Sequence, residues 1–189
     1  DPRLAHKYLE DSVFIARELK EPRLESTALN NLAMSEGSVK GNYELAGEYY
    51  EQSYKIAKEL GDRYQEGIAL GNLGFVAGMQ GNISAAYLHH ENSLFVAREI
   101  GNINLETYTL INLSAVAGLQ KEAGQALKFS KQAEELSRKI HDRSAEAWSL
   151  LYMGHAHLLV AECADARKAY QKSIIIRNEL GQSTLVMEP

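Results

Sequence analysis

This chain repeats itself every forty residues, and that period limits the folds open to it. Alanine recurs at that interval, at Ala46, Ala86, Ala126 and Ala166, and a small residue follows seven positions later in each unit. The first segment of the chain carries the same pattern shifted by one residue. Periods of this length are typical of proteins in which one supersecondary unit stacks on the next to build a shared core.

Each unit is predicted to form two helices and no strand. In residues 63–79, and again in residues 83–100, apolar side chains recur at the spacing of one helical face. Asp62 offers a side-chain cap to the helix that follows it, and Pro22 suits a first helical position. The glycines that follow long helices, where a left-handed residue closes the last turn, are Gly61, Gly101 and Gly181.

This pattern resembles the tetratricopeptide repeat, whose skeleton is a large residue, Leu-Gly, Ala, an aromatic residue and a second small residue. One unit matches it at Leu70, Leu73, Gly74, Gly81, Ala86 and Ser93. The departures are His90 and Ser130 at the aromatic position, Lys121 and Ala161 at the mid-unit glycine, and His141 at a joint glycine. The resemblance implies an all-α, right-handed α-α superhelix of about nine antiparallel helices, with a leading helix and then four helix pairs.

A single repeat domain is expected over residues 1–182, followed by a C-terminal tail, residues 183–189. Its units are expected at about residues 1–40, 41–80, 81–120, 121–160 and 161–182. The long second helices resemble repeats of bacterial maltose-regulator-type transcriptional regulators and of eukaryotic spindle-orientation adaptors. The chain begins at Asp1, within a helical pattern and without a methionine, so we expect it to be a piece of a longer protein.

Charge and composition narrow the classes of partner. The formal net charge is −5, and residues 1–120 hold 10 basic and 16 acidic side chains. Such a surface disfavours nucleic acid and anionic membranes, which both attract basic proteins. Cys163 is the one cysteine, so no intrachain disulfide is possible and a cytoplasmic setting fits. We interpret Cys163 as small filler rather than a nucleophile.

The resemblance also implies where a partner binds, because in this family the first helix of each pair lines the concave surface. The partner-binding positions are then Asn30, Asn31, Met34, Ile68, Asn72, Phe75, Tyr108, Ile111, Asn112, Trp148, Leu151, Tyr152 and His155. Asn31, Asn72 and Asn112 recur once per unit, and an amide side chain can both donate to and accept from a peptide backbone. The apolar members are predicted to anchor partner side chains.

Two interpretations stay open for these residues. The asparagines either hold a peptide or bond a neighbouring helix, and Trp148 and Tyr152 either bind a partner or pack within the stack. The basic residues that hold a C-terminal carboxylate in chaperone-binding members are absent, so a chaperone tail is not expected. Their two positions are occupied by Gly71, Ile111 and Leu151, and by Phe75, Ala115 and His155.

The residues favour no enzyme, cofactor or metal. His155 and His157 are two positions apart and point to different sides of a helix, whereas a zinc pair needs three or four. His90 and His157 fall at core positions of the repeat, and we interpret them as interior side chains. Four glycines do not match a phosphate-binding fingerprint and are attributed to close helix packing; these are Gly71, Gly74, Gly78 and Gly81.

Three functions remain as hypotheses. The first is a scaffold module that binds a protein or peptide within a larger signalling or transcription-regulatory protein. The second is an effector-sensing domain of a bacterial regulator that binds a small ligand, and it rests on resemblance alone. The third is self-association into a homo-oligomer through the ends of the stack, to which Leu158, Leu159 and Val160 contribute.

Overall fold

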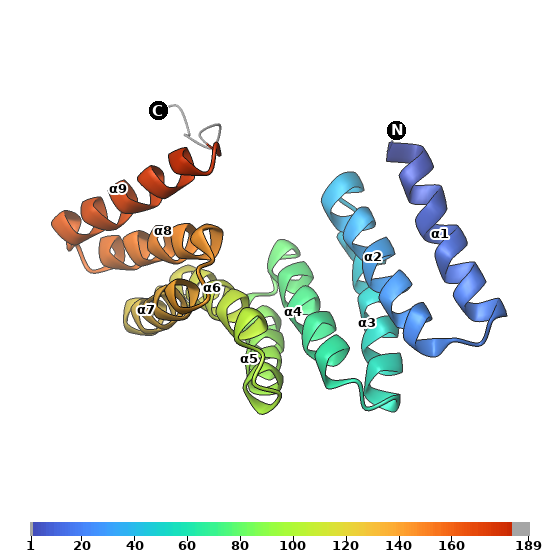
Figure 1. Cartoon of the computed structure of the whole chain (residues 1–189). Coiled ribbons are helices and arrows are strands. Elements are labelled where there is room, and N and C mark those ends of the chain that lie inside the picture. The colour runs from blue at the N-terminus through green and yellow to red at the C-terminus, as the bar shows by residue number, and fades with distance from the viewer. Residues whose placement is uncertain (1, 183–189) are drawn as a thin grey trace. The chain divides into compact units, whose positions relative to one another are not determined.

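The computed structural model describes residues 2–182, which form nine α-helices and no strand. The helices are α1 (Pro2–Glu18), α2 (Pro22–Lys40), α3 (Tyr43–Glu59), α4 (Arg63–Met79), α5 (Ile83–Glu99), α6 (Ile103–Leu119), α7 (Ala123–Lys139), α8 (Arg143–Leu159) and α9 (Cys163–Glu179). Figure 1 shows a leading helix, α1, followed by four helix pairs. The predicted all-α repeat fold is confirmed.

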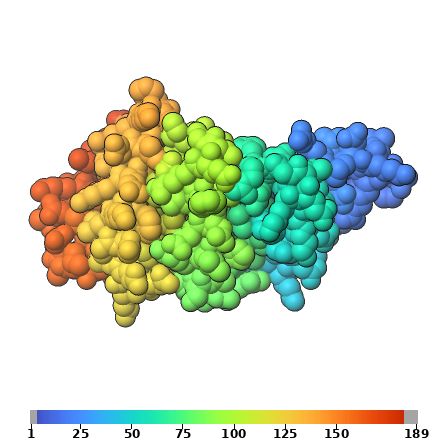
Figure 2. Space-filling view, turned by 90° about the horizontal axis from the view of Figure 1, so that it is seen from below, coloured from blue at the N-terminus to red at the C-terminus, as the bar shows by residue number. Residues whose placement is uncertain are grey.

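The chain divides into two compact units, Asp1–Gly101 (unit 1) and Asn102–Pro189 (unit 2). We call α2, α4, α6 and α8 the A helices and α3, α5, α7 and α9 the B helices. Each A helix packs against the B helix that follows it, and within the units α2 also contacts α4 and α6 contacts α8. Consecutive segments of each unit form neighbouring bands of atoms (Figure 2). The single-domain boundary at residue 182 stays a prediction, and the proposed tail lies outside the described residues.

Left-handed residues end the helices, as the sequence predicts. Gly61, Gly101 and Gly181 have φ angles of 65°, 65° and 70°. His141 holds the same conformation at φ 57°, although a side chain makes that region costly. Gly81 is corrected: its φ is 79° and no atom lies within 4 Å of where a Cβ would stand, so it serves a turn rather than close packing.

Side-chain caps begin most of the A helices. The Asp62 carboxylate accepts a hydrogen bond from the Gln65 backbone N–H at 3.2 Å, which confirms the predicted cap. Asp142 accepts in the same way from Ala145 at 2.9 Å. Each bond satisfies one of the backbone donors that a helix start leaves unpaired. Pro22 stands at the first helical position, where its missing N–H costs nothing.

Serines at the second small position of the repeat tie the helices of a pair together. Ser93 donates to the Gly67 carbonyl at 2.8 Å, and Ser173 donates to the Ala147 carbonyl at 2.7 Å. These hydroxyls are buried, and a buried hydroxyl needs such a partner. The small residues therefore allow the helices to approach closely and also bond them. No described helix combines the length and the apolar character needed to cross a bilayer.

Candidate functional site

The predicted asparagine ladder is connected differently in unit 1. The Asn72 side-chain N–H donates to the Asn30 side-chain oxygen at 2.9 Å, which joins α4 to α2. Asn31, the residue predicted to align with Asn72, is exposed and forms no side-chain hydrogen bond with a described residue. Asn72 therefore bonds a neighbouring helix, which was one of the two interpretations. The Asn31 amide has no hydrogen-bond partner among the described residues.

Apolar side chains are exposed on the A helices of unit 1. Met34 is 55% exposed and Phe75 is 47% exposed, and they stand at the same position of successive units. Phe75 meets the edge of Tyr43 with ring centroids 6.4 Å apart. Met79, one turn beyond Phe75, is 50% exposed, whereas Ile68 is half-buried. The A helices thus offer an apolar strip beside the asparagines.

Three predicted residues of α6 have different environments. Tyr108 is 44% exposed, and its hydroxyl donates to Asp142 at 2.8 Å; burial, and then this bond, raise the pKa of Tyr108 to about 12. Asn112 is half-buried and forms no side-chain hydrogen bond with a described residue. The expected exposure of Ile111 is wrong: it is only 5% exposed, because α6 packs against both α7 and α8 and buries more than one face.

Aromatic rings form a row along α8. Trp148 and Tyr152 stack with centroids 6.2 Å apart, and Tyr152 meets His155 edge-on at 5.7 Å. His155 in turn contacts the Tyr170 ring of α9 at 5.6 Å. Burial lowers the pKa of His155, so this imidazole resists protonation. Trp148, Tyr152 and the neighbouring Leu151 are half-buried, so each keeps part of its surface for contact.

The residues at the C-terminal ends of α6 and α8 line a groove, which we call the α6–α8 groove. Its volume is about 380 Å³, and its lining residues are Ser114, Ala115, Gly118, Leu119, Tyr152, His155 and Leu159. Ala115 and Gly118 leave space on the α6 side, where the same repeat position in unit 1 holds Met34 in place of Ala115. The groove therefore exists because small residues face the aromatic side chains of α8.

Of the residues that line the groove, only Tyr152 and His155 are predicted partner-binding positions. Leu119 is 66% exposed, and Leu159, which the self-association hypothesis uses, is 43% exposed. Leu119 and Leu159 lie four residues after Ala115 and His155, respectively, and residues four apart share one helix face. That spacing was the available signal.

Arg177 is a second omission. Its guanidinium carbon lies 4.2 Å from the centre of the Trp148 ring, in a cation–π contact between α9 and α8. Its positive charge also opposes the effect of burial, which raises the pKa of Tyr152. The sequence does mark Arg177 as unusual, because the equivalent residue one repeat earlier, forty positions before it, is the small residue Ser137.

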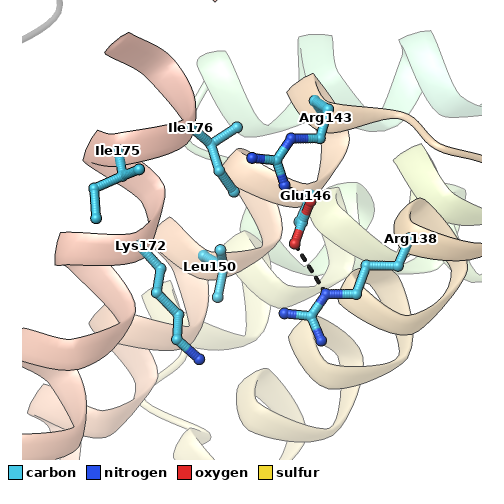
Figure 3. A pocket seen from close by; sticks show the side chains of 7 residues that line it. All are labelled: Arg138, Arg143, Glu146, Leu150, Lys172, Ile175 and Ile176. Carbon is cyan, nitrogen blue, oxygen red and sulfur yellow. Dashed lines mark hydrogen bonds and ion pairs between the residues drawn. The ribbon is translucent and has the colours of Figure 1, made fainter. Parts of the chain in front are cut away.

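A second cavity, of about 230 Å³, opens between α7, α8 and α9 (Figure 3). Arg138 and Arg143 converge on Glu146, at 2.9 Å and 2.6 Å. Arg138 also pairs with Glu134, and Arg143 with Glu179. Because each guanidinium already has two carboxylates, we interpret this basic-looking cavity as a structural ion-pair network.

The other candidate residues support no further chemistry. Cys163 is exposed at the start of α9, so the interpretation as small filler is wrong. His90 is buried as predicted, whereas His157 is half-buried and bonds Glu162 at 2.6 Å. Asp165 can bring a third ligand atom near that pair, but both carboxylates are exposed, and Lys168 already pairs with Asp165.

The comparisons agree with this architecture. Residues 24–99 match a model of the tetratricopeptide repeat family. No curated protein matches the sequence. Among solved structures, BtubC (BKLC) from P. vanneervenii is similar with a TM-score of 0.83 and 18% identity, over 100% of this chain and 77% of that chain.

Two further structures show the same arrangement. The TPR-like repeats of a putative kinesin light chain from Podosopora anserina give a TM-score of 0.72 at 14% identity, over 96% of this chain and 90% of that chain. A signal transduction ATPase with a tetratricopeptide repeat sensor, from Pyrococcus horikoshii, gives 0.80 at 21% identity, over 98% of this chain and 29% of that chain. Identities this low show the fold alone. Residues 24–99 therefore match the tetratricopeptide repeat family, and the described chain shares the fold of these repeat proteins.

Proposed function

We propose that this chain is a scaffold module that binds a polypeptide along its A helices, as part of a larger signalling or transcription-regulatory protein. Tetratricopeptide repeats are generally protein-interaction modules, and the fold is typically a non-enzymatic scaffold. The proposed role involves no catalysis, and we propose that the module acts in the cytoplasm.

The α6–α8 groove is the observation that carries this proposal. Its volume of about 380 Å³ lies at the lower end of the range of ligand sites. Exposed leucines flank it, Leu119 and Leu159, and an apolar strip of this kind favours contact with apolar side chains of a partner. Tyr152 and His155 supply aromatic surface, which is enriched where partners bind most tightly.

Unused amides support a polypeptide rather than another apolar ligand. Asn31 in unit 1 and Asn112 in unit 2 form no side-chain hydrogen bond with a described residue. Each amide offers two donors and an acceptor, which matches the carbonyl and N–H of a peptide bond. Within unit 2, Asn112 lies three residues before Ala115 of the groove, so it can hold a partner backbone beside the groove that takes the partner's side chains.

Filling the groove tests the proposal. We expect Ala115→Leu to weaken the binding of peptides selected from a random display library by about 10-fold or more, because its side chain occupies the groove. The repeat already accepts a large residue at that position, as Met34 shows, so the variant should fold. Affinities would be compared by fluorescence titration.

The matched control is Ala164→Leu, the same substitution at an exposed position of α9 outside the groove. It should bind the selected peptides as the unaltered protein does. Equal affinities for the Ala115 and Ala164 variants would remove the groove from the proposal. A library that yields no peptide at all would favour the small-ligand alternative.

A further inference from the structure

Arg177 occupies a repeat position that elsewhere holds only small, buried residues. The equivalents in α1, α3, α5 and α7 are Ala16, Ala57, Ala97 and Ser137, which are between 0% and 3% exposed. In α9 the same position carries the bulkiest cation. Its side chain is half-buried and lies over Trp148, at 4.2 Å from the ring centre.

The guanidinium of Arg177 lacks the carboxylate that its neighbours have. It forms no ion pair with a described residue, whereas Arg138 and Arg143 each contact two glutamates. One of its terminal nitrogens, Nη2, is shielded from solvent without a hydrogen-bond partner among the described residues. A partly desolvated, unpaired cation is energetically costly, and a carboxylate offsets that cost.

The contact with Trp148 places the charge of Arg177 beside an aromatic surface. The guanidinium carbon lies over the Trp148 ring, and the N–H donors lie in the plane of the guanidinium. Nε and Nη1 are not shielded as Nη2 is, so a carboxylate can accept hydrogen bonds from their N–H groups, and its single charge matches that of the guanidinium. Tyr152 lies within electrostatic reach of Arg177 and stacks on Trp148, so the three residues form one surface.

We propose that Arg177, whose guanidinium lies over Trp148, binds a carboxylate of the partner polypeptide whose apolar side chain enters the α6–α8 groove. This inference rests on the proposed function. It names the partner as an acidic peptide segment, and it places the recognition of charge at a position unique to the last described repeat.

The length of α8 sets the spacing within the partner. Seven residues separate Trp148 from His155 and eleven separate it from Leu159, which corresponds to about 10 to 16 Å along the helix. An extended peptide advances about 3.3 Å per residue, so the acidic residue should stand about three to five positions from the apolar one.

Selection from a random peptide display library tests this directly. The unaltered protein should enrich Asp or Glu at a fixed distance from an apolar residue, and Arg177→Gln should lose that acidic preference while it still selects the apolar residue. Arg167→Gln removes an exposed arginine from the same helix and should leave the preference unchanged. Circular dichroism would verify that each variant remains helical.

A selected peptide then gives the size of the effect. Trp148 is the only tryptophan, so its emission reports binding at this surface. Changing the acidic residue of the peptide to its amide should weaken binding to the unaltered protein by about 10-fold or more, and should change binding to Arg177→Gln little. Arg177→Lys keeps the charge but not the planar edge, and its affinity should fall between the two.

These experiments distinguish failure of this inference from failure of the proposed function. An acidic preference that survives Arg177→Gln, or selected peptides without one, would overturn this inference and leave the proposed function standing. A library that yields no peptide would overturn both. Peptides with free and amidated C-termini distinguish an acidic side chain from a terminal carboxylate. If Arg177→Gln does not fold, the peptide substitution on the unaltered protein and on Arg177→Lys decides.

Discussion

His90 shows how one residue can make the stability of a stack depend on pH. It occupies in α5 the position that Tyr50 and Tyr170 take in α3 and α9, and Gly74 leaves room for its ring. Burial, and then the charge of His89, lower the pKa of His90 to about 4. The unfolded chain therefore accepts a proton on this imidazole, near its ordinary pKa of 6.5, at a higher pH than the folded chain does.

Neutral His90 therefore makes its full contribution to stability above pH 6.5, and this contribution is lost as the pH falls toward 4. We expect His90→Tyr to remove roughly 3 kcal/mol of acid sensitivity over that interval, since tyrosine does not titrate there. Tyr170 against Gly154 shows that the repeat accepts the larger ring. Urea unfolding at pH 7, 5 and 4 would measure it, and parallel pH profiles for the two proteins would contradict it.

We predict that close packing against Tyr170 requires a glycine at position 154. A Cβ built on Gly154 would lie 2.5 Å from Cε1 of Tyr170, a distance at which the ring must shift. We expect Gly154→Ala to lower the free energy of unfolding by about 1–3 kcal/mol through overpacking. Gly124→Ala is the control, because nothing lies within 4 Å of its Cβ position in α7. That change should be neutral or stabilise by up to ~1 kcal/mol, and similar losses at both glycines would refute the packing argument.

At the scale of the helices, the sequence predicts local structure well because its signals are local. The forty-residue period, the cap at Asp62 and the joint at Gly61 each depend on neighbouring residues, and all appear as expected. The site is less predictable, because it depends on how far one helix lies from another. That distance decides that Asn72 bonds Asn30, that Ile111 is buried and that Arg177 covers Trp148.

Glu146 links two helices through two ion pairs. Its carboxylate, 8% exposed, accepts from Arg138 of α7 at 2.9 Å and from Arg143 of its own helix at 2.6 Å. Burial alone would raise the pKa of Glu146, but the bonds from the two arginines outweigh it and the pKa is lowered. A lowered pKa contributes stability above the ordinary carboxyl range, which is lost as the pH falls through the folded-state value.

We therefore expect Glu146→Gln to lower the free energy of unfolding at pH 7 by about 1.5–3 kcal/mol, as for other hydrogen bonds to charged groups. The difference from the unaltered protein should shrink as the pH falls through the folded-state pKa of Glu146, since Glu146 then also becomes neutral. Glu135→Gln, at an exposed position of α7, should change stability by less than ~0.5 kcal/mol. Equal effects of the two substitutions in urea unfolding would assign no role to the pair.

At the scale of the whole molecule, a stack of repeats is stabilised by contacts between neighbours only. Among the described helices, α9 packs against α8 alone, and α1 packs against α2 and reaches α3 only through side chains, as in the hydrogen bond from Arg17 to Gln52. By contrast, α4 contacts α2, α3 and α5, and α8 contacts α6, α7 and α9. Local opening therefore costs least at α1 and α9. Backbone amides in these two helices should exchange with deuterium faster than those of α4 and α8.

A core substitution turns this pattern into a test of coupling. Leu150 of α8 is 2% exposed and clusters with Ala147 and with Ile176 of α9. Leu150→Ala should cost about 2–5 kcal/mol and speed exchange throughout α9, because α8 is the one helix that α9 contacts among those described. Exchange in α1 and α2 should respond less, since these helices belong to unit 1 and the substitution lies in unit 2. Uniformly faster exchange in all nine helices would mean that the chain opens as one cooperative body, against the nearest-neighbour account of its stability.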